Sequence, residues 1–71
     1  MGFRDMDLDD QVRGALRRNR ELSAFRIEVN VRNGIVHLGG NVTSDVRDQA
    51  LQIARGVEDI AVVVDDMSVV I

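Results

Sequence analysis

Apolar positions near the N-terminus recur with the spacing of a helix. Four of them fall at i, i+4, i+7 and i+8, on one stripe of an α-helix: Leu8, Val12, Ala15 and Leu16. Aspartates precede the stripe and arginines follow it, which suits the dipole of a helix that runs in this direction. The pattern predicts a helix over about residues 8–20, preceded by a flexible segment at residues 1–7.

Two alternating runs in residues 26–41 are separated by Asn33-Gly34. This dipeptide predicts a two-residue hairpin, because a type I′ turn needs positive φ at both central positions. The turn fixes the register, so the expected cross-strand pairs are Arg32 with Ile35, Val31 with Val36, Asn30 with His37, Val29 with Leu38, and Ile27 with Gly40. One face then holds the apolar side chains: Ile27, Val29, Val31, Val36 and Leu38. The other face is expected to be mostly wet: Glu28, Asn30, Arg32, Ile35 and His37.

Gly39-Gly40 interrupts the second run, which indicates a bulge, a bend or the close approach of another backbone. A second helical stripe follows it: Val46, Ala50, Ile53, Ala54 and Val57. Candidate N-caps at residues 43–45 and a terminator at Gly56 bound this stripe, so it predicts a helix over about residues 45–55.

The tail from Ile60 to Ile71 is rich in β-branched residues and predicts a third strand. Its phase is ambiguous, because Asp65 shares a face with three apolar residues: Val63, Met67 and Val69. A bulge near Asp65-Asp66 would relieve this conflict.

The order of elements is therefore helix, strand, strand, helix, strand. Each helix has one apolar stripe and the hairpin has one apolar face. We expect an α+β two-layer sandwich, with both helices on one face of a three-stranded sheet. The length allows a single domain, residues 1–71, with its core at about residues 8–70.

The composition offers few residues for chemistry. The chain has one His, no Cys and no Pro among 71 residues. His37 falls mid-strand on the predicted wet face, away from any group that would orient it against a nucleophile. One His without Cys does not make a zinc site, and the glycines form no phosphate-binding loop. We expect no enzymatic activity, no catalytic residue, no metal and no cofactor.

The net charge of -3 hides an uneven distribution of charge. Residues 12–20 hold four Arg and no acid, whereas residues 43–71 hold two Arg and six acids. On a helical wheel three of these arginines lie within about 60° of one another: Arg13, Arg17 and Arg20. They form either an anion-facing surface for lipid headgroups or phosphates, or an ordinary solvated helix face. Nucleic acid is disfavoured, because stacking aromatics are lacking.

The sequence resembles the BON domain, a small module of bacterial envelope proteins. The resemblance begins with Asp9-Asp10-x-Val12 and Ala15-Leu16. Its most specific stretch is Ile27-x-Val29-x-Val31-x-Asn33-Gly34-x-Val36-x-Leu38-x-Gly40-x-Val42. It continues through Ala50, Ala54, Gly56-Val57, Ile60 and Val64-Asp65-Asp66-Met67-Ser68-Val69. The motif is structural: Asn33, Gly34, Gly40 and Gly56 are its turn and packing positions.

The resemblance implies a non-enzymatic module that binds phospholipid or membrane surfaces, or that mediates protein contacts. Domains of this kind occur in osmotically induced periplasmic proteins, often in tandem, so we expect this chain to be part of a longer or multi-domain protein. Its expected partner is anionic phospholipid or an envelope protein. The expected lipid or anion contacts are Arg13, Arg17 and Arg20. The alternative is a protein-interaction or assembly module that uses the sheet edge, or the open sheet face with Ile35, without lipid.

The resemblance also implies a periplasmic or envelope location. Residues 1–10 are acidic and lack the apolar run of a signal peptide, so a cytoplasmic location stays open. The longest apolar stretch, residues 60–64, is too short for a transmembrane segment.

Overall fold

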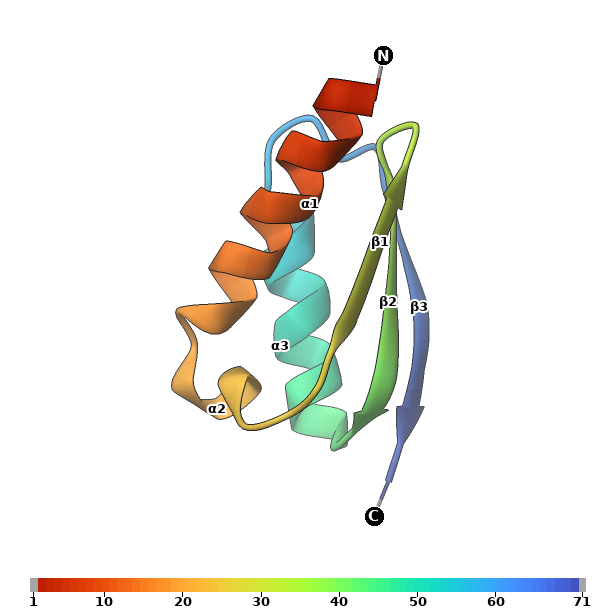
Figure 1. Cartoon of the computed structure of the whole chain (residues 1–71). Helices are drawn as coiled ribbons and strands as arrows, with labels where there is room; N and C mark the ends of the chain where they lie inside the picture. The colour runs from red at the N-terminus through yellow and green to blue at the C-terminus, as the bar shows by residue number, and fades with distance from the viewer. Residues whose placement is uncertain (1, 71) are drawn as a thin grey trace.

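Three helices and three strands make up the computed structural model, which describes residues 2–70. The elements are α1 (Gly2–Arg17), α2 (Arg20–Ser23), β1 (Glu28–Arg32), β2 (Ile35–Val42), α3 (Ser44–Arg55) and β3 (Val62–Val69). The sheet has the order β1-β2-β3, with β1 antiparallel and β3 parallel to β2. The helices cover one face of this mixed sheet and leave the other open (Figure 1). The expected α+β order and layering are confirmed.

The first helix differs from the prediction at both ends. It begins at Gly2, so residues 2–7, which the sequence suggested as a flexible segment, are helical, and residue 1 lies outside the described part. It ends at Arg17, because Asn19 takes an extended conformation and its side chain accepts hydrogen bonds from the first turn of α2. The predicted helix over residues 8–20 is therefore confirmed as far as Arg17 and wrong beyond it, since Arg20 lies in a separate short helix.

The hairpin follows the predicted register. Asn33 and Gly34 have φ of 52° and 77°, as a type I′ turn requires. The ladder runs from Arg32↔Ile35 to Glu28↔Gly39 and includes Asn30↔His37. The carboxylate of Asp5 in α1 accepts hydrogen bonds from the backbone N–H groups of Asn33 and Gly34, at 3.0 and 3.3 Å. The start of α1 is thus attached to the turn.

Gly40 ends the ladder instead of pairing with Ile27. Its φ is +122°, and a Cβ built on it would lie 2.5 Å from the backbone oxygen of Arg26. The expected Ile27–Gly40 pair is absent from the β1–β2 register. The glycine lets the chain that enters β1 cross closely over β2, which is one of the three roles the sequence indicated for Gly39-Gly40.

The helix predicted over residues 45–55 is α3, which begins at Ser44, within one residue of the prediction. Thr43 is its N-cap and its hydroxyl accepts a hydrogen bond from the N–H of Val46. Gly56 is the C-cap, in a right-handed conformation, and its N–H lies within hydrogen-bonding distance of carbonyl oxygens in the last turn. The boundaries that capping residues predicted are therefore close to those observed.

The third strand is regular, so the predicted bulge near Asp65-Asp66 is wrong. The parallel register runs without interruption from Ile35↔Val62 to Val42↔Val69. Asp65 pairs with the buried Leu38 and therefore lies on the helix side of the sheet. This is tolerated because β3 is an edge strand, where the carboxylate lies 3.9 Å from the guanidinium of Arg47 in α3. Ile71, the last residue of the predicted strand, lies outside the described part.

The core lies between the helices and the apolar face of the hairpin. Its buried members are Leu8, Val12, Leu16, Leu22, Val29, Val31, Val36, Leu38, Val42, Val46, Ala50 and Ala54. Every one of these except Leu22 and Val42 belongs to a stripe or face predicted from the spacing of apolar residues, and β3 contributes only half-buried residues. Among the described residues no polar side chain is buried, so chemistry has to be sought at the surface.

Candidate functional site

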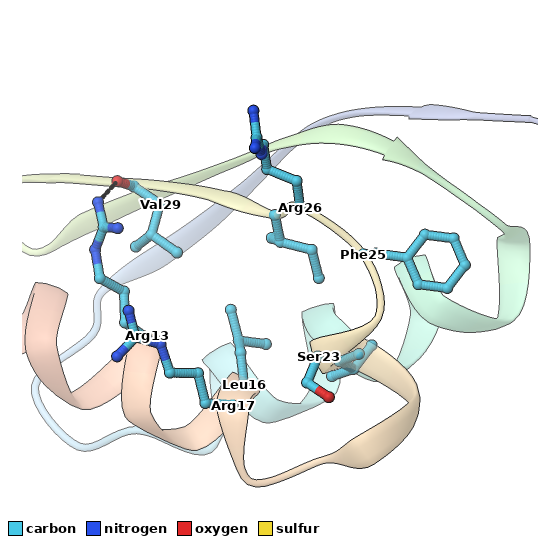
Figure 2. A pocket seen from close by; sticks show the side chains of 9 residues that line it. Arg13, Leu16, Arg17, Ser23, Phe25, Arg26 and Val29 are labelled. Atoms are coloured by element: carbon cyan, nitrogen blue, oxygen red, sulfur yellow. Dashed lines mark hydrogen bonds between the residues drawn. The ribbon is translucent and has the colours of Figure 1, made fainter.

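A groove opens between the end of α1, α2 and the segment that leads into β1. Its volume is about 200 Å³. Figure 2 shows its lining residues: Arg13, Leu16, Arg17, Leu22, Ser23, Phe25, Arg26, Ile27 and Val29. Three of the nine are arginines and five are apolar, so the groove combines cationic walls with an apolar floor. We call it the arginine groove.

Arg13 forms a fixed wall of the arginine groove. Its guanidinium donates to the carboxylate of Asp9, one helical turn earlier, and to the backbone oxygen of Val29 at 3.0 Å. Because Val29 belongs to the edge strand β1, this contact ties α1 to the sheet and satisfies a carbonyl group at the edge. Asp9 offsets part of the Arg13 charge. Arg13 therefore positions the groove and contributes little free charge to it.

Arg17 and Arg26 carry the free positive charge of the groove. Both are exposed, and among the described side chains neither makes a hydrogen bond or an ion pair. Arg17 reaches along α1 towards Arg13, whereas the guanidinium of Arg26 points away from the helices, past β1 (Figure 2). The two charges thus stand on opposite sides of the groove, on side chains long enough to turn towards a bound anion.

The structure regroups the arginines that the helical wheel had placed together. Arg13 and Arg17 line the groove, whereas Arg20 is the first residue of α2 and does not. Arg26 takes the third position and was missed, because it follows the predicted helix by several residues. The available signal was its place directly before Ile27, where the alternation of β1 begins.

A polar network holds α2, whose Leu22 lines the groove, against α3. The amide oxygen of Asn19 accepts from the N–H groups of Glu21 and Leu22, and its amide nitrogen donates to Gln49 at 2.9 Å. Gln49 in turn donates to the carboxylate of Glu21. Leu22 is thereby held in the core as part of the groove floor. The short helix is fixed by three side chains and not by its own length.

His37 lies on the open face of the sheet, as predicted. It pairs with Asn30, and its Nδ1 lies 3.1 Å from a carboxylate oxygen of Asp66 on β3. Both side chains are well exposed, and no hydroxyl or second carboxylate in the described residues makes a hydrogen bond or ion pair with them. No group of three potential metal ligands occurs in the described residues either. The pair is a surface contact between β2 and β3.

One backbone group on each edge strand of the sheet has a side-chain partner. On β1, the guanidinium of Arg13 donates a hydrogen bond to the carbonyl oxygen of Val29. On β3, the carboxylate of Asp65 accepts a hydrogen bond from the N–H of Met67 at 2.9 Å, a group that the β2 ladder leaves free. A blocked N–H beside a fixed charge discourages another strand from pairing there.

Asp65→Val should therefore increase self-association. The substitution frees the N–H of Met67 and extends the apolar run of β3. Asp66→Val is the matched control, because it changes charge and hydropathy equally but removes a side chain that faces the open sheet and contacts His37. Sedimentation equilibrium should show stronger association for Asp65→Val than for Asp66→Val. Equal association would mean that hydropathy, not the capped edge, controls it.

A second hollow, of about 360 Å³, lies between the end of α3 and the start of β3. It is lined by Arg55, Ile60, Ala61, Val62 and Val63, so it carries a single arginine. The arginine groove is smaller but has three cations at its walls, and we therefore take it as the candidate binding site.

Comparison with known proteins supports the resemblance noted in the sequence. The family model for the BON domain matches residues 4–71, which is nearly the whole chain. No curated protein matches the sequence. None of the described helices has the length and hydropathy needed to cross a membrane.

Proposed function

The chain belongs to the BON domain family, and from this premise we propose that it docks on anionic phospholipid at a membrane of the bacterial envelope. BON domains are non-catalytic binding modules that are typically periplasmic or associated with the envelope, and phospholipid binding is the role proposed for them. The observation that carries the proposal here is the pair Arg17 and Arg26, which line an apolar groove and have no hydrogen-bond or ion-pair partner among the described side chains.

The groove suits the chemistry of a membrane surface. A guanidinium makes bidentate hydrogen bonds to phosphate oxygens, and Arg17 and Arg26 are free to make them. The half-buried Phe25 and Ile27 line the same groove, where they can meet the glycerol and upper acyl region of the lipid. Arg20, nearby on α2, adds attraction at longer range. Arg13 links α1 to β1 and so keeps the two sides of the groove together.

The size of the groove favours docking on a membrane over enclosing a lipid molecule. Its volume of about 200 Å³ is below the roughly 300–1,000 Å³ of pockets that bury a small-molecule ligand. A phospholipid is larger than such a ligand, so only part of its headgroup fits. The chain would then contact lipids that remain in the bilayer.

Vesicle co-sedimentation tests the proposal. The full chain should pellet with vesicles of phosphatidylcholine and phosphatidylglycerol, and much less with phosphatidylcholine alone at the same total lipid. Pelleting should fall as NaCl is raised, because the Debye length shrinks to about 10 Å at 0.1 M salt. Equal pelleting with both vesicle types, or with neither, contradicts docking by charge.

The open sheet face favours a second candidate, which is binding of an envelope protein without lipid. No helix covers this face (Figure 1), and Val62, which pairs with Ile35 on it, is 50% exposed. Double substitution of Ile35 and Val62 with Ser should abolish such a contact while vesicle pelleting is unchanged. Sedimentation of the chain with a detergent-free envelope extract, compared with that double variant, distinguishes the two functions.

A further inference from the structure

The molecule is elongated, and its two ends are built from different parts of the chain. Its principal extents are 39 × 21 × 17 Å. One end combines the end of α1, α2, residues 24–27 and the last residues of β2 and β3 (Figure 1). The other end combines the start of α1, the hairpin turn and loop 56–61, which bond to one another through Asp5 and through the N–H of Ala61 on the carbonyl of Gly34.

The charges divide along the same axis. Residues 17–26 at the first end hold four arginines and one acid. The start of α3 lies at the same end (Figure 1), and residues 43–48 there add one arginine and two aspartates. Residues 4–10, in the first half of α1, hold four aspartates and one arginine, and loop 56–61 holds two acids and no base. Arg32 and Arg55 offset part of that negative charge. We call the two ends the arginine end and the acidic end.

Apolar side chains also distinguish the arginine end. The half-buried Phe25 lies at the mouth of the groove. Val69 and Val70, at the C-terminal end of β3, are 41% and 47% exposed. Cationic side chains beside exposed apolar ones are the combination that binds at a bilayer interface. At the acidic end the exposed Met6 is flanked in sequence by Asp5 and Asp7, and the exposed Val62 pairs with Ile35 on the open face of the sheet.

We infer that the domain docks end-on, with the arginine end against an anionic bilayer and the hairpin turn directed away from it. The inference rests on the proposed function and specifies which surface performs it. Docking along the length of α1 would bring the exposed carboxylates of its first half, Asp7 and Asp10, close to lipid phosphates, which repel them. Docking by the arginine end brings its arginines to the lipid phosphates and puts the acidic end about 39 Å away along the longest axis.

Single labelled cysteines test this orientation, because the chain has no cysteine of its own. Ala24→Cys places an environment-sensitive fluorophore at the arginine end. Ala61→Cys is the matched control at the acidic end, since both alanines are exposed and neither is charged. Met6→Cys, at a position 67% exposed, reports on the first half of α1. Each labelled protein is mixed with phosphatidylglycerol-containing vesicles that carry a shallow quencher lipid, and pelleting is measured in parallel.

End-on docking predicts a blue shift and quenching for the label at residue 24, and no change for the labels at residues 6 and 61. A response at residues 24 and 6 together overturns the inference in favour of docking along α1. A response at residue 61, or none at residue 24 in protein that pellets, also overturns it and leaves the proposed function standing. Protein that does not pellet with any vesicle contradicts the proposed function itself, and the orientation with it.

Discussion

Gly40→Ala should lower the melting temperature of the domain by roughly 10–20 °C. A Cβ at this position would lie 2.5 Å from the backbone oxygen of Arg26, and the φ of +122° is one that L-residues rarely adopt. Backbone strain of this kind costs about 1–3 kcal/mol, and displacement of the chain entering β1 adds to it. In a domain of this size each kcal/mol lowers the melting temperature by about 4–8 °C. Thermal unfolding followed by circular dichroism measures the loss.

Gly39→Ala is the matched control for this substitution. Its Cβ would meet only the side chain of Glu28, at 3.7 Å or more, which is ordinary van der Waals contact. Gly39 also lies on the open face of the sheet, so nothing packs over it. We expect less than about 1 kcal/mol of change in the free energy of unfolding. If Gly39→Ala and Gly40→Ala were equally destabilising, the close approach of Arg26 to β2 would not explain the need for glycine.

The contrast between these two glycines shows how far the sequence could predict the fold. Asn33-Gly34 fixed the register of the hairpin, because turn chemistry and alternation are local properties of the chain. The same local information flagged Gly39-Gly40 as unusual but did not tell which of the two is constrained. That depends on where Arg26 passes over β2, and this is set by the break at Asn19 and by the packing of α2.

The candidate site was predictable in part for the same reason. Arg13 and Arg17 belong to one helix, so their spacing places them together. Arg20 was grouped with them by a helical wheel that does not apply beyond Asn19, whose side chain caps a new helix. Arg26 lines the groove because residues 24–27, which connect α2 to β1, pass beside it, and no periodicity in the sequence indicates this. Membership of the groove is thus a property of the fold, whereas the richness in arginine is a property of the sequence.

Asp65 shows a second limit of sequence patterns. Its position on the helix side of β3 conflicts with the apolar phase, and a bulge was the local way to resolve the conflict. In the structure the register continues without a bulge. The carboxylate of Asp65 accepts a hydrogen bond from the N–H of Met67 and lies near the guanidinium of Arg47. Whether an acid is tolerated at such a position depends on the strand lying at the edge, and strand order is not encoded by local spacing.

Arg17→Glu combined with Arg26→Glu should weaken binding to anionic vesicles by roughly a hundredfold. Each basic residue near an anionic surface contributes about 1 kcal/mol, and reversal replaces attraction with repulsion at both sides of the groove. Neither side chain makes a hydrogen bond or ion pair within the described residues, so the fold should be unaffected. Titration of the double variant with phosphatidylglycerol-containing vesicles measures the loss, and circular dichroism checks the fold.

Arg32→Glu combined with Arg55→Glu is the matched control, because it changes the net charge equally at the acidic end. The molecule is 39 Å long and the Debye length at 0.1 M salt is about 10 Å, so charges at that end are screened from a bilayer at the arginine end. This control should bind nearly as well as the unmodified chain. Arg20→Glu alone should cause a smaller loss than Arg17→Glu alone, because Arg20 lies outside the groove. Equal losses in the two double variants would show that net charge, and not the arginine groove, controls binding.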